Sequence, residues 1–372
     1  MRWRSLFGGF DAILFGAALC LTLFGLATMY SHVGENALFY RQAVWIAFAV
    51  GFFFLAMIPD YRLLRTTNLA FYSFLVTVVL LILVLFFGEL VMGARQRFDL
   101  GLFSLQVSDP AKLILIAVLA KYFAKRHELI GDVRHIIISG LYTLILCGLI
   151  FIQPDFGAAA ILFCIWLGMV LVAGIKLRHL TIVFLTGVVT LVGLWQFAFH
   201  DYQKTRILSF LDPLSDIQGA GYNAYQSVVA VGSGQIFGRG IGYGTQSKLL
   251  FLPEYETDFI FAAFAEEWGL VGVLILFALF LVVITRLLQH ALNGASNFEK
   301  LFTIGVAIML LTHFFIHVGI NIGLLPVTGT TIPFLSYGGS HLVTEFVALG
   351  MVLAMHRYTP IKAAPLPAIL PD

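Results

Sequence analysis

Charged residues are scarce in this chain: only 11% of its 372 residues are Asp, Glu, Lys or Arg, while 60% are hydrophobic. Typical soluble globular domains carry about 25% charged residues, so a water-soluble fold is excluded. The few charges nearly cancel to a formal net charge of +2, which leaves no electrostatic footprint for DNA or RNA. We therefore expect no nucleic-acid partner.

Cysteine is also rare, because the chain contains only Cys20, Cys147 and Cys164. All three fall inside apolar stretches, where packing explains a small polarizable side chain. We therefore expect neither a disulfide nor a cysteine-based metal site.

Long apolar stretches dominate what is present, and ten of them reach the roughly 17 to 25 residues that cross a bilayer as a helix. They cover residues 10–30, 43–59, 69–88, 107–124, 136–153, 157–175, 180–199, 259–285, 302–325 and 342–357. The sequence predicts an all-α polytopic membrane protein with ten transmembrane helices. No linker divides it, so we expect a single integral membrane domain over 1–372 with a mobile tail at 359–372.

The placement of Lys and Arg predicts the orientation. In the short loops, most of them fall on the side that also holds both termini, so the positive-inside rule predicts cytoplasmic N- and C-termini. The first apolar stretch has no small-residue cleavage site after a short core and is interpreted as a retained anchor. Residues 200–258, between predicted helices 7 and 8, then form a large extracytoplasmic loop.

This outer loop contains six glycines from Gly232 to Gly244, with Arg239 and Lys248 among or near them. Such a cluster can expose backbone N–H groups and bind pyrophosphate as an anion nest. A glycine-rich re-entrant turn with a structural role is the alternative. No strand precedes the cluster, so a dinucleotide-binding fingerprint is excluded.

Asp258 ends the outer loop directly before the apolar stretch that begins at Phe259. Partial removal from water would raise its pKa toward the neutral range that a general base needs. Alternatively, the carboxylate caps the helix that follows. Glu266 and Glu267 lie about 12 to 13.5 Å farther along that helix. They are too distant to share a reacting atom with Asp258, and we interpret them as a structural hydrogen-bonding pair.

Asp109 and Lys112 lie three residues apart at the start of the fourth apolar stretch and can pair on one helix face. One interpretation is a helix-start ion pair beneath a Ser or Asp cap. In the other, Lys112 faces a cavity and neutralises phosphate while Asp109 holds its rotamer. Arg97, in the preceding outer loop, could then add a second cation.

Two further polar features interrupt the apolar stretches. His313, His317 and Asn321 follow at four-residue spacing, and we interpret them as a buried hydrogen-bonded stripe, because a metal site would need a third ligand that is not apparent. The break at Gln153 and Asp155 is interpreted as structural. The glycine cluster and the loop at 326–341 both lie in the C-terminal half, while the N-terminal half offers only this short break, so an inverted-repeat transporter is not favoured.

A series of motifs, in order along nearly the whole chain, resembles the SEDS family (shape, elongation, division and sporulation). The motifs are Arg206–Pro213, Gly219–Asn223, Gln226-Ser227, Gly232–Gly234, Gly244–Ser247, Phe251–Glu254, Thr257–Phe261, Ala265–Glu267, Leu324–Gly329 and Ser336–Ser340. The short termini and the Gly244–Ser247 segment are more similar to the rod-shape branch than to the division branch, although a division-type paralogue stays open.

This resemblance implies an inverting peptidoglycan glycosyltransferase that polymerises lipid II at the outer face of the bacterial cytoplasmic membrane for cell elongation. Asp258 matches the family's essential aspartate, which implies that it is the general base. Contacts to substrate or pyrophosphate are expected from Arg97, Asp109, Lys112, Arg206, Gln226, Ser227, Ser233, Arg239, Lys248, Glu254, Thr257, Ser336, Tyr337 and Ser340.

The resemblance also implies partners: a cognate class B penicillin-binding protein and other membrane proteins of the elongation complex. A divalent cation, Mg²⁺ or Mn²⁺, bridging carboxylate and pyrophosphate would supply Lewis-acid chemistry, although no complete ligand set is apparent. Two other functions stay open. One is a lipid II flippase that does not use Asp258 as a base, and the other is a non-catalytic scaffold that activates the transpeptidase.

The chain departs from the family pattern at several positions. Asp109 stands where Glu is usual, Phe98 replaces Trp, Glu256 replaces His, His317 replaces Asn, and His341 and Glu345 are unusual after the Ser336–Ser340 motif. These departures affect the shape of the cavity, not the reaction class. A shorter acid at position 109 can still reach Lys112.

Overall fold

The computed structural model describes residues 9–33, 37–91, 94–99, 101, 104–126, 132–197, 199, 201–212, 220–248, 251–252 and 254–357. The predicted mobile tail at 359–372 lies outside the described residues. So does the side chain of Lys248, although its backbone is described.

Within the described part of the chain, nine helices are long and apolar enough to cross a membrane. They are α2 (Ala12–Val33), α3 (Ala37–Ala56), α5 (Leu69–Phe87), α7 (Val133–Ile152), α8 (Phe156–Ala173), α9 (Leu177–Phe197), α13 (Ile260–Asn293), α14 (Asn297–Asn321) and α15 (Gly339–Arg357). The tenth predicted stretch coincides with α6 (Ser108–Ala124), which is 17 residues long and carries Asp109, Lys112 and Lys121. The all-α membrane class is confirmed, and the count of ten crossings stays a prediction.

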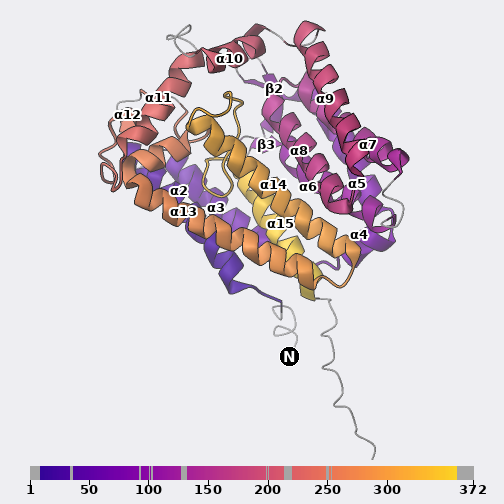
Figure 1. The fold of residues 1–372 in the computed structure, drawn as a ribbon. Helices are drawn as coiled ribbons and strands as arrows, with labels where there is room; N and C mark the ends of the chain where they lie inside the picture. Colours follow the sequence, from indigo (N-terminus) through magenta and orange to yellow (C-terminus); the bar gives the residue numbers. More distant parts are fainter. Residues whose placement is uncertain are drawn as a thin grey trace, which may run out of the picture.

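The helices assemble into one bundle with a mostly apolar core. In it α2 packs on α13, α3 packs on α15, and α14 contacts α6, α8 and α13. Phe53, Phe264, Phe302 and Phe346 are fully buried between them. Helix α9 lies at the edge of the bundle with almost every side chain exposed (Figure 1). An apolar helix can face lipid in this way because its backbone groups are paired within the helix itself.

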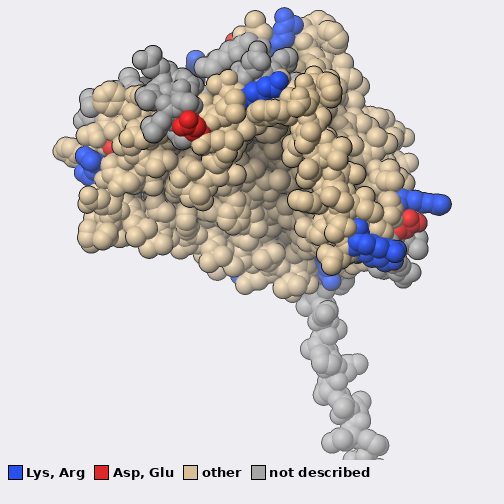
Figure 2. Space-filling model, turned by 45° about the horizontal axis from the view of Figure 1, so that its top comes forward, with Lys and Arg blue, Asp and Glu red and all other residues tan. Residues whose placement is uncertain are grey.

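Figure 2 agrees with this picture, because Lys, Arg, Asp and Glu are sparse on the visible face and most of that face is uncharged. Exposed leucines, phenylalanines and valines cover α5, α7 and α9. An exposed apolar surface of this extent would aggregate in water, whereas it matches the hydrocarbon interior of a bilayer.

Short elements lie at the end of the bundle opposite the start of α2 (Figure 1). They are β1 (Glu89–Val91), β2 (Ala94–Asp99), β3 (Ser104–Gln106), α10 (Asp201–Leu211), α11 (Ala220–Ser233) and α12 (Thr245–Lys248). A further short helix is α4 (Arg62–Thr66). The strands form an antiparallel sheet in the order β1-β2-β3 that the sequence did not predict, and much of the predicted outer loop is helical.

Helix α13 is interrupted at Gly269, whose φ of +63° is favourable only for glycine. The interruption frees backbone groups that the outer segment then satisfies. The N–H groups of Leu270 and Val271 donate to the carbonyl oxygens of Gln235 and Ile236 at 2.9 and 3.1 Å. The glycine-rich segment is therefore built into the break in α13, as the re-entrant-turn interpretation requires.

Candidate active site

Asp258 lies in a tight turn directly before α13. The carbonyl oxygen of Glu254 accepts hydrogen bonds from the N–H groups of Thr257, Asp258 and Phe259 at 3.2, 3.1 and 3.2 Å. Glu254 has a φ of +53°, which is uncommon for a residue other than glycine, so the turn is held by its surroundings. Phe259 is the N-cap of α13 and no side chain caps the helix. The capping interpretation of Asp258 is therefore wrong.

The carboxylate of Asp258 is half-buried and, among the described residues, accepts no hydrogen bond and forms no ion pair. Burial raises its pKa to about 7. The negative charge of Glu254 adds to this rise, while the positive charge of Arg206 on α10 opposes it. An unpaired carboxylate that titrates near neutrality has the properties of a general base.

Asn321, the last residue of α14, fixes the backbone around this carboxylate. Its amide nitrogen donates to the carbonyl oxygen of Asp258 at 3.0 Å, and its amide oxygen accepts from the N–H of Ala262 at 3.0 Å. Ser227 on α11 donates its hydroxyl to the Asn321 carbonyl at 2.9 Å. Asn321 is fully buried. It thus joins α11, α13 and α14 beneath Asp258.

The segment between α14 and α15, residues 322–338, forms one wall of the site. The hydroxyl of Ser336 donates to the carbonyl oxygen of Thr257 at 3.0 Å, and the N–H of Tyr337 donates to that of Glu256 at 2.9 Å. A Cβ atom at Gly329, whose φ is +69°, would lie 3.5 Å from Oδ2 of Asp258. Glycine at this position keeps the space in front of the carboxylate open.

Arg206 reaches the same wall from α10. One of its terminal nitrogens lies 3.5 Å from the carbonyl oxygen of Val327, and its charge acts on Asp258. The structure therefore brings together the predicted residues Asp258, Glu254, Thr257, Ser336 and Arg206 at one end of the bundle.

The histidines of α14 support this wall from below. Nδ1 of His317 lies 2.7 Å from the carbonyl oxygen of Thr330, and Nδ1 of His313 lies 3.2 Å from that of Thr331. Together with the bonds of Asn321, these contacts confirm the hydrogen-bonded interpretation of the stripe. Among the described residues, no group of three or more His, Cys, Asp or Glu side chains is arranged to hold a metal ion.

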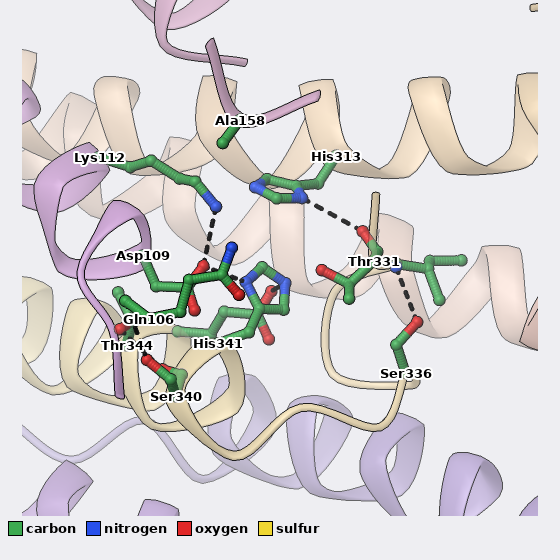
Figure 3. Close-up of polar contacts among 12 residues, drawn as sticks. Gln106, Asp109, Lys112, Ala158, His313, Thr331, Ser336, Ser340, His341 and Thr344 are labelled. Carbon is green, nitrogen blue, oxygen red and sulfur yellow. Dashed lines mark hydrogen bonds and ion pairs between the residues drawn. The ribbon is translucent and has the colours of Figure 1, made fainter. Parts of the chain in front are cut away.

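A second cluster lies at the start of α6. Lys112 and Asp109 form the predicted ion pair at 3.0 Å, and both residues are 4% exposed. The predicted cap is wrong, because α6 begins at Ser108 without a side-chain cap and the buried Ser108 hydroxyl has no partner among the described atoms. Figure 3 shows His341 reaching Asp109 from α15, on another side from Lys112.

Asp155 connects the two clusters. It caps α8 by accepting from the N–H of Ala158 at 2.9 Å, as its structural interpretation requires, and it also accepts from the amide of Gln106 at 3.1 Å. Burial raises the pKa of Asp155, and the charge of Lys112 opposes that rise. The charge of Asp155 in turn raises the pKa of Asp258. Asp155 therefore lies within electrostatic reach of both Lys112 and Asp258.

The sheet carries Arg97 to this site. Arg97 on β2 is aligned with Gln106 on β3, whose amide reaches Asp155. The amide of Gln96 donates to the carbonyl oxygen of Gln153 at 3.3 Å, which fastens the sheet to the break between α7 and α8. Among the described residues, the half-buried guanidinium of Arg97 has no hydrogen-bond or ion-pair partner. It is available to a ligand.

The glycine-rich segment has a different environment. The N–H of Gly242 donates to Oε1 of Glu267 at 2.7 Å, and the N–H groups of Arg239 and Gly240 donate to the carbonyl oxygens of Glu266 and Glu267 at 3.0 and 3.1 Å. Because these N–H groups already donate within the protein, they do not form the predicted anion nest.

Ser233 and Arg239 border a separate cavity of about 330 Å³ that is lined by residues 233–239. Ser233 donates to the carbonyl oxygen of Ala230 at 2.9 Å, and Nε of Arg239 donates to that of Ser233 at 3.3 Å. No contact among the described residues brings either of them to Asp258.

The remaining candidates are placed as follows. Gln226 is half-buried on α11 beside Ser227. Ser340 donates its hydroxyl to the carbonyl oxygen of Gln106 at 3.3 Å. Gln153 is buried and donates to the carbonyl oxygen of Leu81 at 2.9 Å, as its structural interpretation requires.

Three residues were not predicted as part of the site: Asn321, Gln106 and Gln42. Gln42 is 1% exposed on α3, and its amide lies 3.4 Å from the Ser336 carbonyl oxygen and 3.4 Å from the N–H of Gly338. The sequence signal for Gln42 was its position directly before an apolar stretch, because an amide that is buried there must find hydrogen-bond partners. The sequence could not show which partners these are.

Comparison with known proteins identifies the family. The family model described as cell cycle protein (FtsW, RodA and SpoVE) matches residues 6–361. The chain is 36% identical to the probable peptidoglycan glycosyltransferase FtsW of Thioalkalivibrio sp. (strain K90mix), covering 95% of this chain and 91% of that protein. It is also 36% identical to the peptidoglycan glycosyltransferase MrdB of Escherichia coli (strain K12), covering 77% of each.

Among solved structures, a chain from a peptidoglycan synthase complex that coordinates polymerization and crosslinking superposes with a TM-score of 0.80. It is 32% identical, and the match covers 94% of this chain and 98% of that one. The family model spans nearly the whole sequence, and described residues of several motifs, among them Arg206, Thr257 and Ser336, lie around Asp258. This chain belongs to the FtsW, RodA and SpoVE family of cell cycle proteins, the SEDS family.

Proposed function

We propose that this protein is a peptidoglycan glycosyltransferase that polymerises lipid II into glycan strands, with Asp258 as the general base. Its relatives are named for that activity, which supports the reaction class. The single observation that carries the mechanism is the carboxylate of Asp258, which is unpaired among the described residues and has a pKa raised to about 7.

In the proposed reaction, the 4-hydroxyl of an incoming sugar attacks the anomeric carbon of the lipid-linked donor. A carbon–oxygen bond forms to the acceptor while the bond to undecaprenyl pyrophosphate breaks, which inverts the anomeric centre. Asp258 takes the hydroxyl proton, and the leaving group departs with the electron pair of the broken bond. A positioned base contributes typically 10²- to 10⁴-fold to such a step.

Cations stabilise the negative charge that develops on the pyrophosphate. Arg97 is the best placed for direct contact, because it is half-buried and without a protein partner among the described residues. Arg206 acts from the α10 side, where its charge already reaches Asp258. Lys112 is 4% exposed, so it contributes its charge from beneath the site.

A divalent cation stays a proposal without a protein ligand set. No three His, Cys, Asp or Glu side chains converge among the described residues, so an ion would have to be held by Asp258 and the oxygens of the substrate. We derive no step through such an ion.

Several finer assignments belong to the same proposal. The protein is a multi-pass membrane protein, and we place it in the bacterial cytoplasmic membrane with cytoplasmic termini and an outward-facing site. Its motifs favour the rod-shape branch, and equal identities to FtsW and MrdB keep the division role as the alternative. The match to a synthase complex supports a class B penicillin-binding protein as partner.

A lipid II flippase and a non-catalytic scaffold are the competing functions. Neither requires an unpaired carboxylate with a raised pKa, since a transported headgroup or a docked partner does not need proton abstraction. A buried or half-buried carboxylate without a partner costs folding energy, so its presence favours a chemical role.

The test uses the purified full-length protein, alone and with its cognate transpeptidase, and labelled lipid II. We expect glycan polymer from the native protein and none from Asp258→Ala or Asp258→Asn, although both variants fold. Asp99→Asn is the matched control, because Asp99 lies at the same end and, within the described part of the chain, its side chain accepts only from the nearby N–H of Gly101 at 2.8 Å. Polymer from Asp258→Asn would remove the base assignment. Translocation in liposomes that needs no polymerisation would favour the flippase.

A further inference from the structure

His341 connects two buried carboxylates beside the Lys112–Asp109 ion pair. Its Nδ1 lies 3.4 Å from Oδ1 of Asp109, and its Nε2 lies 2.9 Å from Oε1 of Glu345. Lys112 contacts the same oxygen, Oδ1, of Asp109 at 3.0 Å. Two side chains from different helices therefore share one carboxylate oxygen (Figure 3).

The geometry identifies His341 as an imidazolium. A neutral imidazole has one N–H donor and one acceptor nitrogen, so its acceptor would face a carboxylate oxygen. With both nitrogens protonated, each carboxylate faces a positively charged ring, and the contact with Glu345 is an ion pair without hydrogen-bond geometry. Two cations, Lys112 and His341, then lie beside two anions, Asp109 and Glu345, and all four are buried. A buried ion without a counter-ion is strongly destabilising.

The second oxygen of Glu345 is not available to Lys112. Oε2 accepts from the N–H of Phe334 at 2.9 Å, at a position where Phe334 has a φ of +62°. Glu345 therefore has two contacts, one that holds the wall segment 322–338 and one that orients His341.

Asp109, His341 and Glu345 thus lie in contact as a set. A longer acid at 109 would extend toward the imidazole that now lies 3.4 Å from Asp109. The short side chain of Asp109 therefore leaves room for the imidazole.

We propose that His341 is a positioning residue for the pyrophosphate end of the site. By taking a share of the Asp109 charge, it leaves the ammonium of Lys112 incompletely neutralised and fixes the direction in which that ammonium points. Lys112 then presents more positive charge to the departing pyrophosphate than a one-to-one pair with Asp109 would allow. This inference rests on the proposed function.

The main test is a double-mutant cycle on glycan synthesis by the full-length protein with labelled lipid II. His341→Gln leaves one uncompensated anion, and we expect kcat to fall about tenfold or more with KM changed less than about threefold, because the interaction matters chiefly in the transition state. His341→Gln combined with Glu345→Gln restores the charge balance. We expect the double variant to recover part of the lost kcat.

A second arm tests the steric fit between the side chains of Asp109 and His341. We expect Asp109→Glu alone to lower kcat, because the longer acid meets the imidazole. Asp109→Glu with His341→Ala should recover activity, because the longer acid can then pair with Lys112 alone. A merely structural role for His341 predicts the opposite, with each added substitution lowering both activity and thermal stability.

His179→Gln is the matched control, because His179 is also a buried histidine but lies at the start of α9, outside the site. It should leave kcat and KM unchanged. The proposal fails if His341→Gln retains kcat within about twofold, or if the double variant is no better than the single one. Asp258→Asn, assayed in parallel, distinguishes a failure of the proposed function from a failure of the role proposed for His341. Activity in that variant overturns the proposed base but not the role of His341.

Discussion

Two groups of carboxylates on the same helix segment have opposite environments. Asp258 precedes α13 by two residues and, among the described residues, has no partner for its side chain. Glu266 and Glu267 lie two turns farther on and are buried, and both are hydrogen-bonded. Glu267 accepts from Gly242 and from the hydroxyl of Ser31, each at 2.7 Å, and Glu266 accepts from the N–H of Gln246 at 2.9 Å.

The difference distinguishes carboxylates with a structural role from the carboxylate with a proposed chemical role. Glu266 and Glu267 accept hydrogen bonds from protein donors and thereby serve as structural contacts. A carboxylate withdrawn from water without donors is destabilised as an anion, so it accepts protons near neutrality. The glutamates thus hold the outer segment to α13, while Asp258 stays reactive.

The largest expected effect is that of Asp258→Asn on polymerisation. The amide keeps the size of the side chain and removes the base, so the rate should fall about 10²- to 10⁴-fold. Glycan synthesis from labelled lipid II measures it, with gel filtration as the check on folding. A fall of less than about tenfold would contradict the distinction between Asp258 as the base and Glu266 and Glu267 as structural residues.

Asn321→Ala should have the next largest effect. It removes the amide that holds the Asp258 carbonyl and the N–H of Ala262, so the carboxylate shifts while remaining chemically intact. A displacement near 1 Å costs up to about 10²-fold in rate, and we expect kcat to fall between tenfold and that limit. Ser227→Ala is the milder control, because it removes one bond to Asn321 and none to Asp258. A native kcat for Asn321→Ala would show that Asp258 is positioned otherwise.

The pH dependence gives a smaller effect. A base must be deprotonated, so with a pKa of about 7 for Asp258, kcat/KM should rise with pH and level off above pH 7. At pH 6 it should be about tenfold below the plateau.

The pH dependence of folding stability has the opposite sign to that of the rate. A folded-state pKa above the ordinary 3.8 means that stability is lost as pH rises through about 7. Asp258→Asn should therefore have a higher Tm than the native protein at pH 8, measured by thermal unfolding in detergent. A rate independent of pH from 6 to 8 would contradict the assignment.

The smallest effect on rate is expected for Glu267→Gln. The amide can no longer accept from both Gly242 and Ser31, which costs about 1 to 3 kcal/mol of stability. The Tm should fall and protease should cut the glycine-rich segment faster, while kcat of the folded fraction stays within about threefold. Loss of kcat without loss of Tm would give Glu267 a role in chemistry and contradict its assignment as a structural residue.

Much of the fold followed from the sequence because lipid imposes a simple rule. Every backbone polar group in a bilayer must be paired, so long apolar stretches become helices wherever they occur. Each predicted stretch coincides with a helix, although some ends differ by several residues, as for 259–285 against Ile260–Asn293. The Asp109–Lys112 pair was also predictable, because a three-residue spacing places both side chains on one helix face.

Other features depended on contacts between distant segments. The sheet that carries Arg97 forms from three short strands, and Gln96 and Gln106 connect it to Gln153 and Asp155. The Ser and Asp caps proposed for α6 and α13 were wrong, because tertiary turns end in Val107 and Phe259 and leave Ser108 and Asp258 without that role.

The sequence by itself determined the membrane class, the positions of the helices and the presence of an acid at the mouth of one of them. These depend on hydropathy and spacing, which are local properties of the chain. Only the tertiary structure decided which acids are paired and which are free, and that His341 and Lys112 share Asp109. Hydrogen bonds and charges act across a few ångströms of space regardless of separation along the chain, so only the packing of the helices defines them.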